Sequence, residues 1–313
     1  MFLYTVKRLA ATLPTLLAVL TVIFVIIRIA PGDPAVAILG DNASQQAIDA
    51  LRERLGMNVP LLNQYLSFIA NAFTGDLGNS LVSGRAVLRE ILDVLPHTLD
   101  LTLASILIGV VLGVPIGIVA AVYRNGPIDY VARVASLLGL SFPAFYTAIL
   151  LILAFSIHYP WFPVMSGADL ADPVDRLYKL VLPAFSLGLI MVAYVARTTR
   201  SAMIEALSGD YIRTARAKGV PRHVVILRHG LRNAIIPVIT VIGLYLGLLI
   251  GNSVITEIVF VRPGLGKLIV GALEQRDYTM LQGLMVVYAF FIVITNLLTD
   301  LTYGVSDPRV KYQ

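Results

Sequence analysis

The sequence lacks cysteine entirely and is poor in charge. None of its 313 residues is cysteine, which excludes disulfide bonds, thiol catalysis and cysteine metal sites. Charged residues make up only 14% of the chain, against about 25% in typical soluble domains. Hydrophobic residues make up 58%, and the mean hydropathy is +0.83. This charge deficit predicts a membrane protein, in which the net charge of +5 reflects basic cytoplasmic loops rather than nucleic-acid binding.

Six uncharged runs are long enough to cross a bilayer. A spanning helix needs roughly 20 apolar residues, with a range of about 17–25. The runs that meet this length are 9–27, 101–123, 134–157, 180–196, 234–256 and 278–299. A seventh run, 55–75, contains several Asn and Gln side chains, which hydrocarbon would leave without partners. We therefore predict six spans, and a surface or interfacial helix within 55–75.

Loop charges predict that both termini lie on the cytoplasmic side. Cytoplasmic loops collect Lys and Arg, and this orientation places the eight basic residues from Arg197 to Arg232 inside. It also puts fourteen of the nineteen acidic residues outside. Lys7 and Arg8 precede the first run as they would in a signal peptide. That run is longer than a signal core and no A-x-A cleavage pattern follows it, so we predict an uncleaved anchor.

The order of the runs divides the chain into four parts. We predict an amino-terminal segment with the first span (1–30), a small helical cap outside the membrane (31–96), a five-helix core (97–302) and a cytoplasmic tail (303–313). Within the core, the charged loop 197–233 joins the fourth and fifth spans. The cap is too small for a separate enzyme domain.

The sequence also lacks groups that power transport or catalyse reactions. The six runs contain no Asp, Glu, Lys, Arg or His, which argues against a proton-driven transporter and against a charged-filter channel. No two of the four histidines are three or four residues apart, so a helical metal pair is missing. The stretch GLGK at 264–267 is not a Walker A motif, because Val261 replaces its first glycine and Leu268 its Ser or Thr. Any pumping must draw its energy from another polypeptide.

The stretch EALSGDYIRTARAKGV, residues 205–220, predicts a short charged helix between the fourth and fifth spans. Asp210 is a good N-cap after the helix breaker Gly209, and Gly219 is a good C′ residue. A helix of about two turns is marginal by itself in water, so it must dock against something. The residues alone leave open anionic lipid headgroups, a cytoplasmic partner protein and nucleic acid, which the lack of interleaved aromatic residues disfavours.

This stretch carries a family resemblance. Residues 205–209 and the later Ile236-Pro237 resemble the EAA…G…I-x-P signature of permease subunits of bacterial ABC importers, with Leu207 in place of the second alanine. Further stretches resemble the dipeptide, oligopeptide and nickel branch of that family: DYIRTARAKG, LRNAIIPVITVIG, APGDP, GDLGNS, PGLG and DPRVKY. The resemblance covers essentially the whole chain. It implies an all-α polytopic protein of the bacterial inner membrane with the type I ABC-importer permease fold.

The resemblance also implies a division of labour among subunits. The family's permease pairs with a second, related permease, two cytoplasmic ATPases bind beneath, and an extracytoplasmic solute-binding protein delivers the substrate. This chain then has no catalytic residue, metal or cofactor, and ATP and Mg²⁺ belong to the ATPases. The short helix becomes the coupling helix, which sits in a groove of the ATPase, with Gly209 as the bend before it. The coupling residues carried onto this sequence are Glu205, Ala206, Gly209, Asp210, Tyr211, Arg213, Ala215 and Gly219.

Two further sets of residues are candidates for the pathway and for helix packing. Polar positions on apolar runs are candidate pathway residues, although helix–helix hydrogen bonding explains each of them as well: Ser136, Ser141, Tyr146, Tyr245, Asn252 and Ser253. Two tandem GxxxG patterns predict close packing within the chain, or against a partner subunit or along a moving pathway: Gly109, Gly113 and Gly117, and Gly243, Gly247 and Gly251. Prolines at or within several runs can each kink a helix: Pro14, Pro115, Pro143, Pro183 and Pro237.

Peptides are the favoured substrates of such an importer. Glutathione, nickel chelates and opine-like solutes stay open, because specificity resides largely in the solute-binding protein. Outside the family, a secondary transporter and a membrane scaffold are the alternatives. Uptake that persists without ATP would favour the transporter, and copurification without any ATPase would favour the scaffold.

Overall fold

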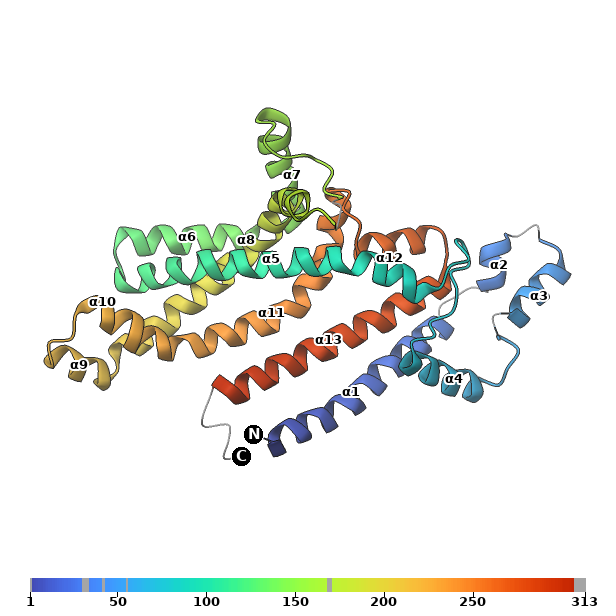
Figure 1. Ribbon diagram of the computed structural model, residues 1–313, viewed down its shortest axis with the longest axis horizontal. Coiled ribbons are helices and arrows are strands. Elements are labelled where there is room, and N and C mark those ends of the chain that lie inside the picture. The colour runs from blue at the N-terminus through green and yellow to red at the C-terminus, as the bar shows by residue number, and fades with distance from the viewer. Residues whose placement is uncertain (1, 30–33, 41–42, 55, 168–170, 307–313) are drawn as a thin grey trace. The chain divides into compact units, whose positions relative to one another are not determined.

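Helices are the regular elements of the residues that the structure describes, beside one isolated β-bridge between Asn79 and Ala86. The computed structural model describes residues 2–29, 34–40, 43–54, 56–167 and 171–306 (Figure 1). Five of its helices are long and apolar enough to cross a membrane, and a bent pair makes a sixth crossing if it is one span. The predicted all-α, multi-span fold is confirmed. Residues 30–33 and 307–313, which hold most of the APGDP and DPRVKY stretches and of the predicted tail, lie outside the described residues.

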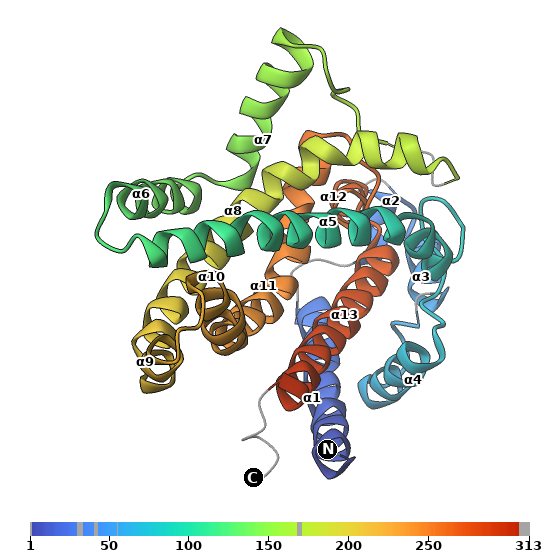
Figure 2. The ribbon, with the colours of Figure 1, turned by 60° about the vertical axis from the view of Figure 1, so that its left-hand side comes forward.

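The chain divides into two compact units. One comprises 1–5, 97–266 and 295–313, and the other comprises 6–96 and 267–294. The second unit is built from α1 (Phe2–Ile29), α2 (Pro34–Leu39), α3 (Gln45–Arg54), α4 (Leu61–Thr74), and parts of α12 (Leu265–Glu274) and α13 (Tyr278–Ser306). Leu20 and Phe24 of α1, Phe68 of α4 and Val286 of α13 share its core. Figures 1 and 2 show α1 and α13 side by side in this unit.

The polar run 55–75 forms the surface-type helix α4. This helix has 14 residues and ends at Gly75, whose φ of 80° places it in the left-handed region. At about 1.5 Å per residue, α4 is about 21 Å long, which is well short of the hydrocarbon thickness of about 30 Å. The polar content and the length of the helix therefore agree that this segment does not span.

The first unit is organised around one long helix. Its elements are the larger part of α5 (Val87–Val122), then α6 (Pro127–Ser141), α7 (Ala144–Ile152), η1 (Leu153–His158), α8 (Pro173–Ser208), α9 (Asp210–Ala217), α10 (Arg222–Val224), η2 (Val225–Gly230), α11 (Leu231–Val259) and the end of α13. The central helix, α8, packs against α6, α7 and α11 (Figure 2). Asp172 caps it by accepting hydrogen bonds from two amides of its first turn. The predicted fourth span, 180–196, is thus only the middle of a helix of 36 residues.

A close parallel contact joins α5 to α8. Each glycine of the first GxxxG tandem faces a residue one turn further along α8: Gly109 faces Met191, Gly113 faces Val195 and Gly117 faces Thr199. A Cβ on Gly117 would lie 2.6 Å from the Cβ of Thr199, so the two backbones approach as only glycine permits. α5 also begins at Val87, so the last cap segment and the second span form a single helix, which the sequence analysis had separated.

The third uncharged run, 134–157, is not one straight helix. α6 and the following α7 and η1 meet at 99°. Phe142 and Pro143 between them have extended backbones, with ψ of 125° and 146°. Proline disfavours a helical conformation at the preceding residue, which explains why the break falls at this pair. The single continuous span predicted over 134–157 is therefore corrected to two half-helices.

Two ion pairs clamp the ends of α8. Near its start, the Arg176 guanidinium donates two hydrogen bonds to Asp100 of α5. Near its end, Arg200 binds the fully buried carboxylate of Asp129 of α6, with one contact at 2.8 Å. The two arginines are 24 positions apart, which is about 36 Å along a helix. This length exceeds the hydrocarbon thickness of about 30 Å only slightly, so we infer that the two clamps lie near the two membrane boundaries.

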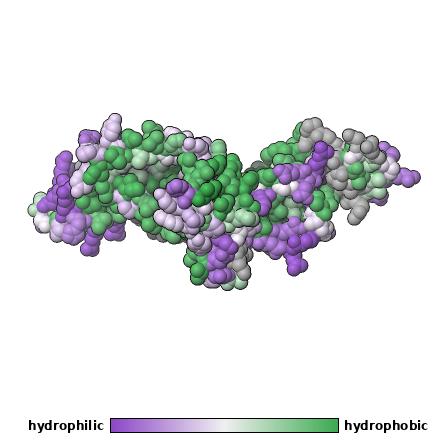
Figure 3. Space-filling view, turned by 90° about the horizontal axis from the view of Figure 1, so that it is seen from above, coloured by the Kyte–Doolittle hydropathy of each residue, from purple (hydrophilic) through white to green (hydrophobic). Residues whose placement is uncertain are grey.

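Surface hydropathy agrees with these boundaries. Figure 3 shows apolar side chains over the body of the first unit and hydrophilic ones at the end that carries α9 and α10. Large apolar side chains of α5 such as Leu103 and Leu107 are more than half exposed, as lipid-facing residues are.

Candidate functional site

The charged insert leaves α8 through a sharp turn at Gly209. α8 ends at Ser208, Gly209 is extended with φ −68° and ψ 151°, and α9 begins at Asp210. Gly209 is therefore the N-cap residue, and the predicted N-cap at Asp210 is wrong. The Asp210 carboxylate accepts a hydrogen bond from Arg213 at 3.3 Å instead of capping amides. Its charge in the first turn still suits the helix dipole.

Tyr211 closes this turn over the signature residues. Its hydroxyl donates to the Ala206 carbonyl at 2.9 Å. Its ring fills the space that a Cβ on Gly209 would need, since that atom would lie 2.6 Å from the ring Cε1. Any residue can adopt the backbone angles of Gly209, so the ring, not the conformation, demands glycine here. Glu205, at the start of the signature, is exposed.

The far end of α9 closes in a Schellman motif. The Gly219 amide donates to the Arg216 carbonyl at 3.0 Å, and the Val220 amide donates to the Ala215 carbonyl at 3.2 Å. Gly219 has φ +75°, a left-handed conformation that glycine adopts without strain. Gly219 thus occupies the C′ position that the sequence predicts, and both ends of the short helix are defined.

One face of α9 is packed against its own chain and the other is exposed. Ile212 and Ala215 are buried against Val225 of η2. This contact explains how a helix of only 8 residues persists. On the opposite face, the side chains of Arg213 and Asp210 are 79% and 94% exposed. The insert is therefore a short packed helix at the end of α8 with a charged outer surface.

Three of the six candidate pathway residues line one cavity. Ser141, Tyr245 and Asn252 border a cavity of about 290 Å³ where α6 breaks off against α8 and α11. Tyr194 of α8 joins them, with its ring centroid 3.9 Å from that of Tyr245. The sequence analysis missed Tyr194, although this residue is a polar-tipped side chain in an uncharged run, as Tyr245 is.

The other three candidates lie outside this cavity. The Ser136 hydroxyl donates to the Ala132 carbonyl of its own helix at 2.8 Å. Ser253 is buried and donates to the Ile250 carbonyl at 2.8 Å. Tyr146 stacks on Phe142 with ring centroids 5.3 Å apart. For Ser136 and Ser253, hydrogen bonding within the helix accounts for the polar group.

The second glycine tandem is packed at only one of its three positions among the described residues. A Cβ on Gly243 would come within 2.9 Å of three side-chain atoms of Thr299 in α13. Nothing that the structure describes lies within 4 Å of a Cβ placed on Gly247 or Gly251. The described residues therefore leave these two glycines of α11 uncovered.

Two family models match this sequence. Residues 113–312 match the binding-protein-dependent transport system inner membrane component, and residues 1–102 match the N-terminal family of such membrane components. The chain belongs to this permease family. The predicted resemblance to permease subunits of bacterial ABC importers is thereby confirmed.

Individual relatives and solved structures agree with the family. The chain is 41% identical over 310 residues to the glutathione transport system permease protein GsiC of Escherichia coli O6:H1, covering 99% of each chain. The same protein of Pectobacterium atrosepticum is also 41% identical, with the same coverage. In fold, the chain resembles inward-facing structures of the MetNI methionine ABC transporter with a TM-score of 0.58. That match has 18% identity and covers 70% of this chain and 96% of the other.

Membership settles the general role of the permease. It is a multi-pass protein of the bacterial inner membrane and a non-catalytic subunit of an ABC importer. Hydrolysis of ATP belongs to partner subunits, and a binding protein delivers the solute. The absence of a Walker A motif from the sequence agrees with this division.

A buried polar network at the outward end of the permease escaped the sequence analysis. Glu257 and Arg262 are fully buried on either side of the turn that ends α11. Glu257 accepts hydrogen bonds from the Thr98 hydroxyl at 2.7 Å and from the Gly266 amide at 2.8 Å. Arg262 lies 3.8 Å from Asp100, and burial lowers its pKa. The network holds this turn in place. In the sequence, its only signal is the pair of charged residues Glu257 and Arg262 just before the PGLG stretch.

Proposed function

We propose that this permease forms half of a translocation pathway for short peptides, paired in a heterodimer with a second, related permease. Two ATPases that bind ATP and Mg²⁺ drive it through α9, which acts as the coupling helix. The observation that carries the proposal is that α9 follows α8 directly after the turn at Gly209 and is packed against η2. A force on α9 then reaches the helix on which the rest of the core is packed.

The geometry of α8 supports this transmission. The helix has 36 residues, or about 54 Å at 1.5 Å per residue, and continues from the outward clamp to Ser208. It packs against both α6 and α7, on either side of the 99° break. Movement of α8 would therefore change the angle between the two half-helices. Tyr194, in the same helix, lines the cavity beside the break.

The cavity supports a neutral, hydrogen-bonding substrate group. Its polar lining consists of tyrosine, serine and asparagine side chains, which can both donate and accept hydrogen bonds, as peptide groups require. No group of three His, Cys, Asp or Glu that could hold a metal ion occurs among the described residues. Both features favour a peptide over a metal ion as the species that contacts this half of the pathway.

Glutathione is the first substrate to test, because it is itself a tripeptide and the 41% identical relatives are named as glutathione permeases. The permease would be reconstituted in proteoliposomes with its partner permease, ATPases and the binding protein encoded beside it. We expect ATP-dependent uptake of glutathione or of di- and tripeptides. Uptake restricted to nickel chelates would refute the substrate class, and uptake without ATP would refute the mechanism.

A matched pair of substitutions tests the cavity. Tyr245→Ala removes a ring that lines the cavity, whereas Tyr146→Ala removes one outside it. If the cavity contacts substrate, Tyr245→Ala changes the KM or the preference among peptides, and Tyr146→Ala leaves both unchanged. Equal effects of the two substitutions would show that the cavity has no special role.

A further inference from the structure

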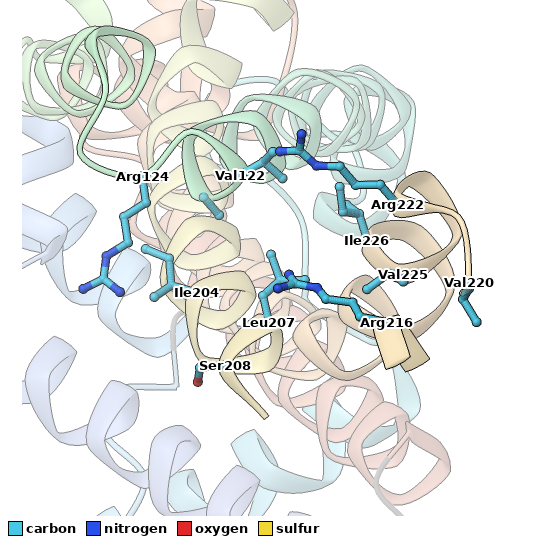
Figure 4. A pocket seen from close by; sticks show the side chains of 11 residues that line it. Val122, Arg124, Ile204, Leu207, Ser208, Arg216, Val220, Arg222, Val225 and Ile226 are labelled. Atoms are coloured by element: carbon cyan, nitrogen blue, oxygen red, sulfur yellow. The ribbon is translucent and has the colours of Figure 1, made fainter. Parts of the chain in front are cut away.

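A groove rimmed by three arginines lies beside α9. It is on another side of the helix than the exposed face with Asp210 and Arg213, which we call the coupling surface. The groove has a volume of about 620 Å³. Figure 4 shows Arg216 and Arg222 reaching in from the side of α9 and α10, with Arg124 on the opposite side. Its floor is apolar and includes Val122 and Leu207. We call it the arginine groove, and we propose that it binds the headgroup of an anionic phospholipid of the cytoplasmic leaflet.

The charges of the groove have no partner among the described residues. None of the side chains of Arg124, Arg216 and Arg222 forms an ion pair or a hydrogen bond with another residue that the structure describes, and the lining contains no Asp or Glu. Guanidinium groups bind phosphate through paired, charge-assisted hydrogen bonds. Three arginines around one groove, with no acidic residue in its lining, therefore suit a phosphate-bearing ligand.

The depth of the groove matches the headgroup layer. α5 and α8 run in register, with Gly117 against Thr199, and the contact of Ala121 with Met203 continues this register. The groove begins at this level, about one helical turn, or 5.4 Å, beyond the inner clamp at Arg200. α5 also ends here, at Val122, and the uncharged run of the sequence ends at Tyr123. Polar headgroups occupy this layer next to the hydrocarbon.

The mixed lining favours a lipid over an acidic segment of a partner protein. Apolar side chains of α8 and η2, including Ile204 and Ile226, line the groove below the arginines. A phospholipid offers both a phosphate for the rim and glycerol and acyl carbons for the floor. A cytoplasmic leaflet rich in such lipids attracts basic groups near the membrane surface.

The groove and the coupling surface lie on different faces of α9. At 100° per residue, Arg216 lies 40° from the buried Ile212, whereas Arg213 lies 100° from it and is 79% exposed. Arg216 therefore turns toward the membrane side, and the outer face stays free for the ATPase. The lipid would support α9 on the side of Arg216 while the ATPase acts on the outer face that carries Arg213.

The test measures lipid selectivity of the full-length permease in detergent by native mass spectrometry. The protein is titrated with dioleoyl phosphatidylglycerol or dioleoyl phosphatidylcholine. We expect wild type to retain phosphatidylglycerol preferentially. Arg216→Gln should lower that preference about fivefold, the effect of about one basic residue near a charged membrane surface. Arg213→Gln, a matched charge removal on the outer face, should leave it unchanged.

Combined variants separate charge from fold. Changing all three arginines to Gln should abolish the preference. Changing all three to Lys should retain only part of it, because the charges remain but the paired guanidinium hydrogen bonds are lost. A preference that survives the triple Gln change, or that falls equally in Arg213→Gln, overturns the proposal.

Two competition outcomes would also overturn it. If millimolar inorganic phosphate displaces the lipid from wild type, the groove is a free-anion site. If the partner ATPase displaces it, the groove belongs to the protein interface.

Discussion

Replacing Gly209 with alanine should loosen the turn between α8 and α9 through the ring of Tyr211, not through the backbone. The φ of −68° and ψ of 151° at Gly209 are open to any residue. The added Cβ would lie 2.6 Å from Cε1 and 3.0 Å from Cδ1 of the ring, so the ring must swing away. Moving the ring breaks the hydrogen bond from its hydroxyl to the Ala206 carbonyl, now 2.9 Å long.

The expected magnitude is that of one exposed hydrogen bond. A net contribution of about 1 kcal/mol corresponds to about a fivefold change in the population of the closed turn. Hydrogen exchange would measure it at the Ile212 amide, which donates to the Gly209 carbonyl at 3.0 Å. Exchange should quicken about fivefold in Gly209→Ala. If α9 couples the ATPases, substrate-stimulated ATP hydrolysis by the assembled transporter should fall in parallel.

Tyr211→Phe supplies the control, because it removes the same hydrogen bond without crowding the turn. Both single variants should show similar exchange, and the double variant should be little worse than either, since the bond can be lost only once. Strictly multiplicative effects in the double variant would refute the reasoning. So would unchanged exchange in Gly209→Ala.

Three other predictions follow from contacts within the first unit. Gly113→Ala should destabilise the permease by about 1–3 kcal/mol through overpacking against α8 and should lower its unfolding temperature in detergent. Gly251→Ala should leave that temperature nearly unchanged, because no described atom lies within 4 Å of the added Cβ. Asp129→Asn should lower the free energy of unfolding by about 3–5 kcal/mol, because it breaks the ion pair of a buried carboxylate. Asp210→Asn should lower it by less than about 1 kcal/mol, because its ion pair is exposed. Equal losses in chemical unfolding would contradict both expectations. Tyr245→Phe, which removes only the hydroxyl, should still change the KM or the preference among peptides, because that hydroxyl is one of the proposed hydrogen-bonding groups; uptake kinetics would measure this.

Much of the fold could be predicted because the bilayer restricts the chain so severely. Uncharged runs of sufficient length locate the helices that cross it, and their charged ends set the orientation. Pro143 marked a possible kink within the third run. The sequence could not give the 99° angle, because that angle depends on how α7 packs against α8 and α11.

The coupling segment could be predicted in outline but not in its first turn. Gly219 was located correctly because a left-handed C′ residue favours glycine so strongly. Asp210 was misassigned because Gly and Asp are both acceptable N-caps, and only the path of the chain decides between them. The role of the ring of Tyr211 depends on a contact that spacing alone does not reveal.

Long-range polar contacts were the least predictable part. Glu257 directly follows an uncharged run and looks like an ordinary loop acid. Its burial depends on Thr98, which is 159 positions away in the sequence. The GxxxG spacing of Gly113 predicted close packing, but its partner on α8 became visible only in three dimensions.

Site-specific crosslinking tests the central claim most directly, namely that the outer face of α9 is where the ATPase acts. The chain has no cysteine, so one introduced thiol reports from one position only. In membranes containing the whole transporter, Arg213→Cys should crosslink to an ATPase subunit through a short bifunctional reagent. Arg216→Cys, on the groove side, and Arg176→Cys, at the outward end, should not. Failure at Arg213→Cys, or equal crosslinking from all three positions, would contradict the account.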